Sequence, residues 1–157
     1  MTEVFNIANV GFLNIYVIHS VLISAVSFIV PLYMLIRRKY ENKLHAFVLV
    51  VLLLFAPAYL YEVLPSMKDE YTILHSIYDN QTYQIAEGYI TDYHSRSNLG
   101  NYVVNGIKFE YFYNIVTYAH NNTRLQGSPL KNGVYVKIYY TDLYNNQIIA
   151  LWIDNEK

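Results

Sequence analysis

Two long runs of apolar residues dominate the first part of the chain. Residues 15–36 and 44–64 contain no acidic or basic side chain other than histidine and Glu62. At about 1.5 Å per residue the first run reaches roughly 33 Å, enough to cross a hydrocarbon layer of about 30 Å. A run that is apolar on every side belongs in lipid or in the core of a large protein, and this chain has only 157 residues. We therefore predict two transmembrane helices, at 15–36 and 44–64.

The segment between the two runs, residues 37–43, is strongly basic. It contains one acid, Glu41, whereas the segment before the first run contains no Lys or Arg at all. Basic loops stay in the cytoplasm, so this loop is expected there, with the short N-terminal segment 1–14 and both termini outside. The chain is thus predicted to cross the cytoplasmic (inner) membrane twice. The residues that determine this topology are Arg37, Arg38, Lys39 and Lys43.

One side of the first predicted helix carries small residues and a proline. They recur at spacings of four, three and four, which places them on one helical face where helices approach closely. The face is expected to contact the second helix of the same chain, and the alternative is docking to another membrane subunit. Its residues are Ser20, Ser24, Ser27 and Pro31.

From residue 65 to residue 157 the apolar positions alternate instead of running on. Residues 66–82 are compatible with a short helix or a first strand, and 83–93 is a strand candidate with a bend at Gly88. Asn105-Gly106 between two alternating runs predicts a two-residue hairpin turn, because both turn residues take positive φ.

Two more alternating runs follow the hairpin, which makes five principal strands. Closing such a sheet into a barrel removes its edges. We therefore predict a two-helix transmembrane hairpin plus an all-β domain at 65–157, a small five-stranded OB-like or SH3-like barrel in preference to a sandwich.

The composition excludes several classes of function. The chain has no Cys, which excludes disulfides, cysteine zinc sites and a thiol nucleophile, and its formal charge of -1 is too balanced for a nucleic-acid binder. No phosphate-binding lysine motif, dinucleotide fingerprint or G-x-S-x-G motif is present. We therefore expect no catalytic residues, no metal, no cofactor and no nucleic-acid partner.

Two polar loops of the β domain are the candidates for partner binding, since functional residues concentrate in loops. If the fold brings them together, they form a hydrogen-bonding surface for a carbohydrate, a peptide or a protein. Two merely solvated loops are the alternative. The candidate residues are His94, Arg96, Asn98, His120, Asn121, Asn122 and Arg124.

Parts of the second half are similar to a recurring bacterial domain of unknown function. The similar stretches include VNGIKFEY at 104–111, GSPLKNGVYVKIYY at 127–140 and NQIIALWI at 146–153. The resemblance implies a bacterial origin and a β fold, and it covers none of the apolar runs. In layout alone, a membrane anchor followed by a small barrel also resembles the NfeD family.

The expected function is a non-enzymatic, membrane-anchored interaction module of the cell envelope, with the lipid bilayer and another envelope or membrane protein, or a glycan, as its partners. An immunity protein against a secreted toxin is one concrete version. The alternatives are a small accessory subunit of a membrane protein complex and an envelope hydrolase.

Overall fold

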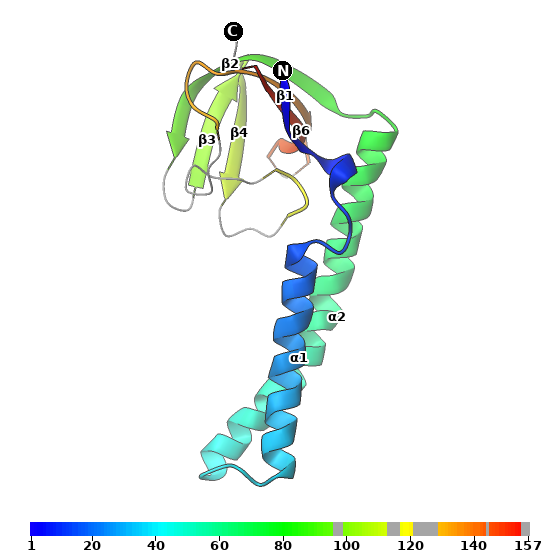
Figure 1. The fold of residues 1–157 in the computed structure, drawn as a ribbon, viewed down its shortest axis with the longest axis vertical. Helices are drawn as coiled ribbons and strands as arrows, with labels where there is room; N and C mark the ends of the chain where they lie inside the picture. The colour runs from blue at the N-terminus through cyan, green and yellow to red at the C-terminus, as the bar shows by residue number, and fades with distance from the viewer. Residues whose placement is uncertain (96–98, 113–116, 121–128, 144, 155–157) are drawn as a thin grey trace. The chain divides into compact units, whose positions relative to one another are not determined.

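The computed structural model describes residues 1–95, 99–112, 117–120, 129–143 and 145–154 (Figure 1). The chain divides into two compact units, which are described separately. One unit comprises residues 11–69, and the other comprises residues 1–10 together with 70–157. The second unit therefore combines the two ends of the chain, whereas the sequence predicted a separate N-terminal segment and a β domain that starts at residue 65.

The first unit contains one long helix and the greater part of a second, whose residues from Glu70 onward belong to the other unit. Helix α1 spans Ile15–Ile36, the range predicted, and helix α2 spans Lys43–Asp79. The side chain of Asn14 caps α1 by accepting from Val17 N at 3.0 Å, and Asn42 caps α2 by accepting from His45 N at 2.8 Å. Both helices are long and apolar enough to cross a membrane.

Helix α2 continues well beyond the predicted end at residue 64. It passes through Pro65 and ends only where Gln81 takes a positive φ of 55°, with Thr82 N donating to Ile77 O at 3.0 Å. This is the six-to-one bond of a Schellman motif, a strong helix stop. Residues 66–82 were predicted to form either a short helix or a first strand. In the structure the residues up to Asp79 are helical and continue α2.

Six strands are described in the other unit, and all their pairings are antiparallel. Their order in the sheet is β1-β6-β5-β2-β3-β4. Their bounds are Thr2–Asn6 for β1, Gln84–Ser95 for β2, Leu99–Val104 for β3, Ile107–Phe112 for β4, Tyr135–Thr141 for β5 and Gln147–Asp154 for β6. The strand that the sequence did not predict is β1, which pairs with β6 along the edge of the sheet. A short 3-10 helix, η1 (Ile7–Asn9), follows it.

The sheet is strongly bent because its longest strand serves two pairings. The first half of β2, up to Tyr89, pairs with β5, and from Ile90 onward β2 pairs with β3. The predicted Asn105-Gly106 turn joins β3 to β4, with φ of 49° and 78° at its two residues. The described strands form an open sheet, since β1 and β4 remain its two edges. The predicted barrel type is therefore not confirmed.

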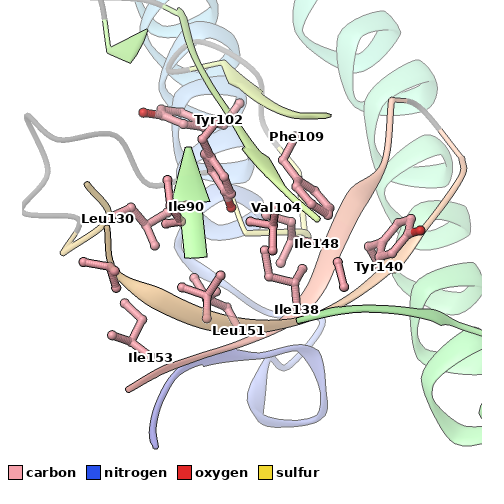
Figure 2. Close-up of a cluster of buried hydrophobic side chains, with 14 residues drawn as sticks. Ile90, Tyr102, Val104, Phe109, Leu130, Ile138, Tyr140, Ile148, Leu151 and Ile153 are labelled. Atoms are coloured by element: carbon pink, nitrogen blue, oxygen red, sulfur yellow. The ribbon is translucent and has the colours of Figure 1, made fainter. Parts of the chain in front are cut away.

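The concave side of the sheet holds the hydrophobic core, to which β2 through β6 all contribute (Figure 2). Phe109 on β4 meets the ring of Tyr140 on β5 edge-on at 5.2 Å, and Asn146 Nδ2 donates to Lys108 O at 3.0 Å. These contacts bring the start of β4 close to the turn between β5 and β6, so the sheet curls without pairing its edges.

A glycine in this core leaves room for a tyrosine. A Cβ at Gly100 would lie 2.0 Å from Tyr111 Cζ, and Tyr111 is held by its hydroxyl, which donates to Tyr93 Oη at 3.2 Å. We expect Gly100→Ala to lower the free energy of unfolding by about 2 kcal/mol, because overpacking forces the ring out of place. Denaturant titration in detergent, followed by the fluorescence of the single tryptophan, Trp152 on β6, measures it. Gly11→Ala, which meets no atom within 4 Å, is the control and should change nothing.

A buried hydroxyl in the same core is unsatisfied. Tyr102 is fully buried and, within the described part of the chain, its Oη has no hydrogen-bond partner; burial raises the pKa of this phenol. Tyr102→Phe should therefore raise the free energy of unfolding by about 1 kcal/mol. The matched control is Tyr140→Phe, which removes the 2.7 Å bond from Tyr140 Oη to Gln84 Oε1 and should lower stability by about the same amount. Equal effects of the two substitutions in the same titration would contradict the prediction.

Candidate functional site

The basic residues predicted to determine topology lie at the turn of the helical pair. Arg37, Arg38 and Lys39 follow the last residue of α1, and Lys43 is the first residue of α2; all four are exposed. The guanidinium of Arg37 and the ammonium of Lys39 lie 5.9 and 5.6 Å from the centre of the Tyr33 ring. This places the charges beside an aromatic side chain at one end of the apolar pair.

The small-residue face of α1 is the face that the helical unit buries. Ser24 and Pro31 are buried and Ser20 and Ser27 are half-buried, while most of the large apolar side chains of α1 are exposed. On α2 the buried positions include Leu49 and Ala56, seven residues apart, which is the spacing of a helix-packing seam. Ser24 and Pro31 are thus covered within the helical unit, as the expected contact inside the chain requires.

The seven predicted partner-binding residues are only partly within the described residues. Arg96, Asn98, Asn121, Asn122 and Arg124 lie outside them. His94 is exposed, and it belongs to β2 rather than to a loop, opposite Asn101 of β3. His120 was expected to contribute to an exposed surface, but it is buried and does not.

His120 occupies the edge of β6 next to β1. Its backbone N–H donates to Ile148 O at 2.9 Å, and its ring lies 5.3 Å from the ring of Phe5 on β1. Only 8 % of the residue is exposed, and its Nε2 has no hydrogen-bond partner among the described residues. Burial lowers the pKa of His120 to about 4, so the ring is neutral at physiological pH.

The residues just before His120 attach this edge to the last turns of α2. Thr117 Oγ1 donates to Glu70 Oε1, which also accepts from Gln147 Nε2 at 3.4 Å. The ring of Tyr118 meets Tyr71 edge-on at 5.2 Å, and burial, together with the nearby carboxylate of Glu70, raises the pKa of Tyr118 to about 12. We call residues 117–120 the clasp, because they contact α2, β1 and β6.

The N-terminal segment is attached to α2 as well. His75 Nε2 lies 3.1 Å from Val10 O, and Asn6 Nδ2 donates to Tyr78 Oη at 3.2 Å. Ile7 and Leu74 are among the most deeply buried side chains of the unit although neither belongs to the main core cluster. The clasp, Ile7 and Leu74 thus belong to a second packed region beside the concave core, which Phe5 of β1 also contacts.

The convex side of the sheet carries a continuous group of aromatic rings. Tyr83 stacks on Tyr139 at 4.3 Å with an interplanar angle of 12°, and Tyr139 meets the edge of Trp152 at 4.7 Å. On its other side Tyr83 faces Tyr78 of α2 at 6.1 Å. Lys137 Nζ lies 5.4 Å from the centre of the Tyr139 ring, which shows that these rings accept a cation.

The same side exposes large apolar area beside charged groups. Ile85 and Tyr89 on β2 are 53 % and 52 % exposed. Tyr89 contacts Tyr135 on β5 edge-on at 5.0 Å, and Tyr135 Oη donates to Glu87 Oε1 at 2.9 Å, a bond that raises the pKa of Tyr135. We define this surface as the outer aromatic face; it comprises Tyr83, Ile85, Glu87, Tyr89, Tyr135, Lys137, Tyr139 and Trp152.

The register of the strands explains why these residues share one side. Glu87, Lys137 and Trp152 are direct partners across β2, β5 and β6, and Glu3 of β1 continues the row. They alternate with the buried side chains of the core. This surface lies on strands and not in the loops predicted to bind a partner, and its signal in the sequence is the alternation of apolar and mixed positions in residues 134–141.

The surface is suited to recognition by contact. The exposed ring of Tyr89 and the partly buried rings beside it supply apolar area and stacking, and the neighbouring carboxylate and ammonium groups supply direction. Among the described residues no group of three or more His, Asp or Glu side chains could hold a metal ion. Of the features seen here, the outer aromatic face is the best candidate for a functional site.

Comparison with known proteins adds no relative. No family model matches the chain, and neither a curated protein nor a solved structure matches it.

Proposed function

We propose that the protein is a non-enzymatic interaction module that is anchored in the cytoplasmic membrane and binds a protein or glycan partner outside the cytoplasm. The observation that carries the proposal is the outer aromatic face, a surface on a folded β unit where the exposed Ile85 and Tyr89 lie beside partly buried rings and charged groups. An immunity protein that intercepts a secreted toxin remains one concrete version.

The exposure of the helices supports the membrane anchor. Only 17 % of the apolar window of α1 and 11 % of that of α2 are buried, whereas the core helix of a soluble protein is mostly buried. Side chains such as Leu22, Ile29 and Leu54 are more than half exposed. So large an exposed apolar surface requires an apolar environment, which a bilayer supplies.

The pairing of β1 with β6 supports a topology with two crossings. β1 precedes α1 and β6 follows α2, yet the two strands form one antiparallel ladder that includes Glu3 with Trp152 and Asn6 with Ala150. Segments that pair in one sheet lie on the same side of a bilayer. The chain between them must then cross an even number of times, as two transmembrane helices do.

The positive charges between the helices support the proposal that the sheet lies outside the cytoplasm. Arg37, Arg38, Lys39 and Lys43 lie in or beside the short turn between α1 and α2, and such loops remain in the cytoplasm. The β unit is then in the envelope, and its outer aromatic face is available to partners there.

The topology can be tested with single cysteines, since the natural chain has none. Glu41→Cys lies in the basic turn and Asp142→Cys lies between β5 and β6, and both positions are exposed. In intact spheroplasts a membrane-impermeant maleimide should label Asp142→Cys, and it should label Glu41→Cys only after the membrane is opened. The reverse labelling pattern would place the outer aromatic face in the cytoplasm and overturn the proposal.

The binding surface can be tested by photo-crosslinking in cells. A benzophenone side chain at Tyr89 should give a discrete crosslinked product, and one at Leu143, which is 39 % exposed but belongs to no part of the face, should not. Ile85→Glu should reduce the product at position 89 by at least about tenfold, because a charge disrupts apolar contact at the centre of an interface. Circular dichroism checks that the variants fold, and a product at position 143 alone would contradict the assignment of the surface.

A further inference from the structure

The edge of β6 is covered in two adjoining pieces. β1 covers it from Ala150 to Ile153, and the backbone N–H of His120 covers Ile148. The two pieces touch through the rings of Phe5 and His120. Because the side chain of His120 lies where β1 and the clasp meet, its protonation state affects both segments together.

We propose that His120 makes this edge acid-sensitive: protonation of its imidazole releases the clasp and β1 from β6 while the concave core of the sheet stays folded. The proposal is independent of the partner that the outer aromatic face binds.

The buried site cannot accommodate an imidazolium ion. His120 Nε2 has no hydrogen-bond partner among the described residues, and the neighbouring Phe5 presents an aromatic ring rather than a carboxylate. A buried charge without a partner is strongly destabilising, so the protonated ring must move to water. Moving it breaks the contact with Phe5 and strains the 2.9 Å bond to Ile148.

Titratable groups on the packed elements do not offset this cost. They include Glu3 on β1, Asp154 on β6, Tyr118 in the clasp, and Glu70 and His75 on α2. None of them contributes to the shift of the His120 pKa, which burial alone lowers. Glu70 accepts hydrogen bonds from Thr117 and Gln147, and His75 lies against Val10, so both are engaged elsewhere.

The direction of the pH effect follows from proton linkage. The pKa of His120 is about 4 in the folded chain and 6.5 in a free histidine, so the open form binds the proton more tightly. The closed clasp is fully stable above pH 6.5 and loses stability as the pH falls toward 4. Over that window the opening equilibrium should increase by about 80-fold, and by about 300-fold in total between pH values well above 6.5 and well below 4.

Local release is favoured over unfolding of the whole unit. β1 has only five residues, its pairing with β6 is interrupted by a bulge at Val4, and its first residues are exposed. Edge elements with few buried contacts open before the core. The main core cluster draws its buried members from β2 to β6 and the loop before β5; β1 adds only the partly buried Phe5 at its margin, and the clasp supplies no member.

The natural tryptophan reports the release. Trp152 is the only tryptophan, and it is the direct partner of Glu3 on β1. In the full chain in detergent, its fluorescence should show a reversible transition with a midpoint between pH 6.5 and 4, while the far-UV circular dichroism of the sheet persists. His120→Gln should abolish the transition, and His94→Gln, which changes an exposed histidine, should leave it intact.

A second variant, Phe5→Ala, keeps the proposal falsifiable if His120→Gln does not fold. Phe5→Ala removes the ring that covers His120, and it should shift the midpoint of the transition to a higher pH. The proposal is overturned if wild-type fluorescence is unchanged down to pH 4, if the transition survives in His120→Gln, or if fluorescence and far-UV dichroism are lost together.

Discussion

The pairing of β1 with β6 is the constraint on which the rest of the architecture depends. It joins the first six residues of the chain to its last strand, with two long apolar helices between them. The ladder can form only if both ends are on the same side of whatever the helices cross. It also means that the sheet is incomplete until the helical pair has folded back, so sheet assembly and helix placement are coupled.

Local signals in the sequence identified the elements that depend on local interactions. The bounds of α1 follow from an unbroken apolar run that stops at Arg37, and the β3–β4 hairpin follows from Asn105-Gly106. β1 could not be identified in this way, because five residues carry little pattern and the partner strand lies at the other end of the chain. The continuous length of α2 was not predicted, because the apolar run ends at residue 64 and residues 66–82 fitted either a separate short helix or a strand, although the helix stops only before Gln81.

The candidate sites likewise divide into those that depend on local sequence and those that depend on segments far apart in the chain. The face of α1 marked by Ser24 and Pro31 depends only on helical spacing, and the structure buries it. The burial of His120 involves Phe5, which is far away in sequence, so a polar neighbourhood suggested a solvent exposure that His120 itself does not have. The outer aromatic face required strand register, because Trp152, Lys137 and Glu87 become neighbours only once β6, β5 and β2 are aligned.

Buried polar atoms without partners mark where this fold is least well satisfied. Within the described residues three of them belong to the β unit, on Tyr102, His120 and Gln147, and the last two are at the clasp or bonded to it. The concave core therefore has one such atom, on Tyr102. At the clasp there are two, on the neutral ring of His120 and on the Gln147 amide, whose Nε2 is bonded but whose Oε1 is not, and the clasp lies beside the short edge strand β1. An imperfectly satisfied region is the part of a structure that a change in conditions opens first.

The outer aromatic face and the clasp meet at β6, although they were inferred from different observations. Trp152 belongs to the face, and its cross-strand partner on one side is Glu3, which β1 supplies. If β1 leaves, the row that runs from Glu3 through Trp152 and Lys137 to Glu87 loses its outermost acid and β6 becomes the edge. An exposed edge with unpaired backbone groups is a template for pairing with another strand. If the outer aromatic face binds a partner as proposed, acidification would change both the charge of that face and the backbone groups beside it, and a single histidine would control what the face contacts.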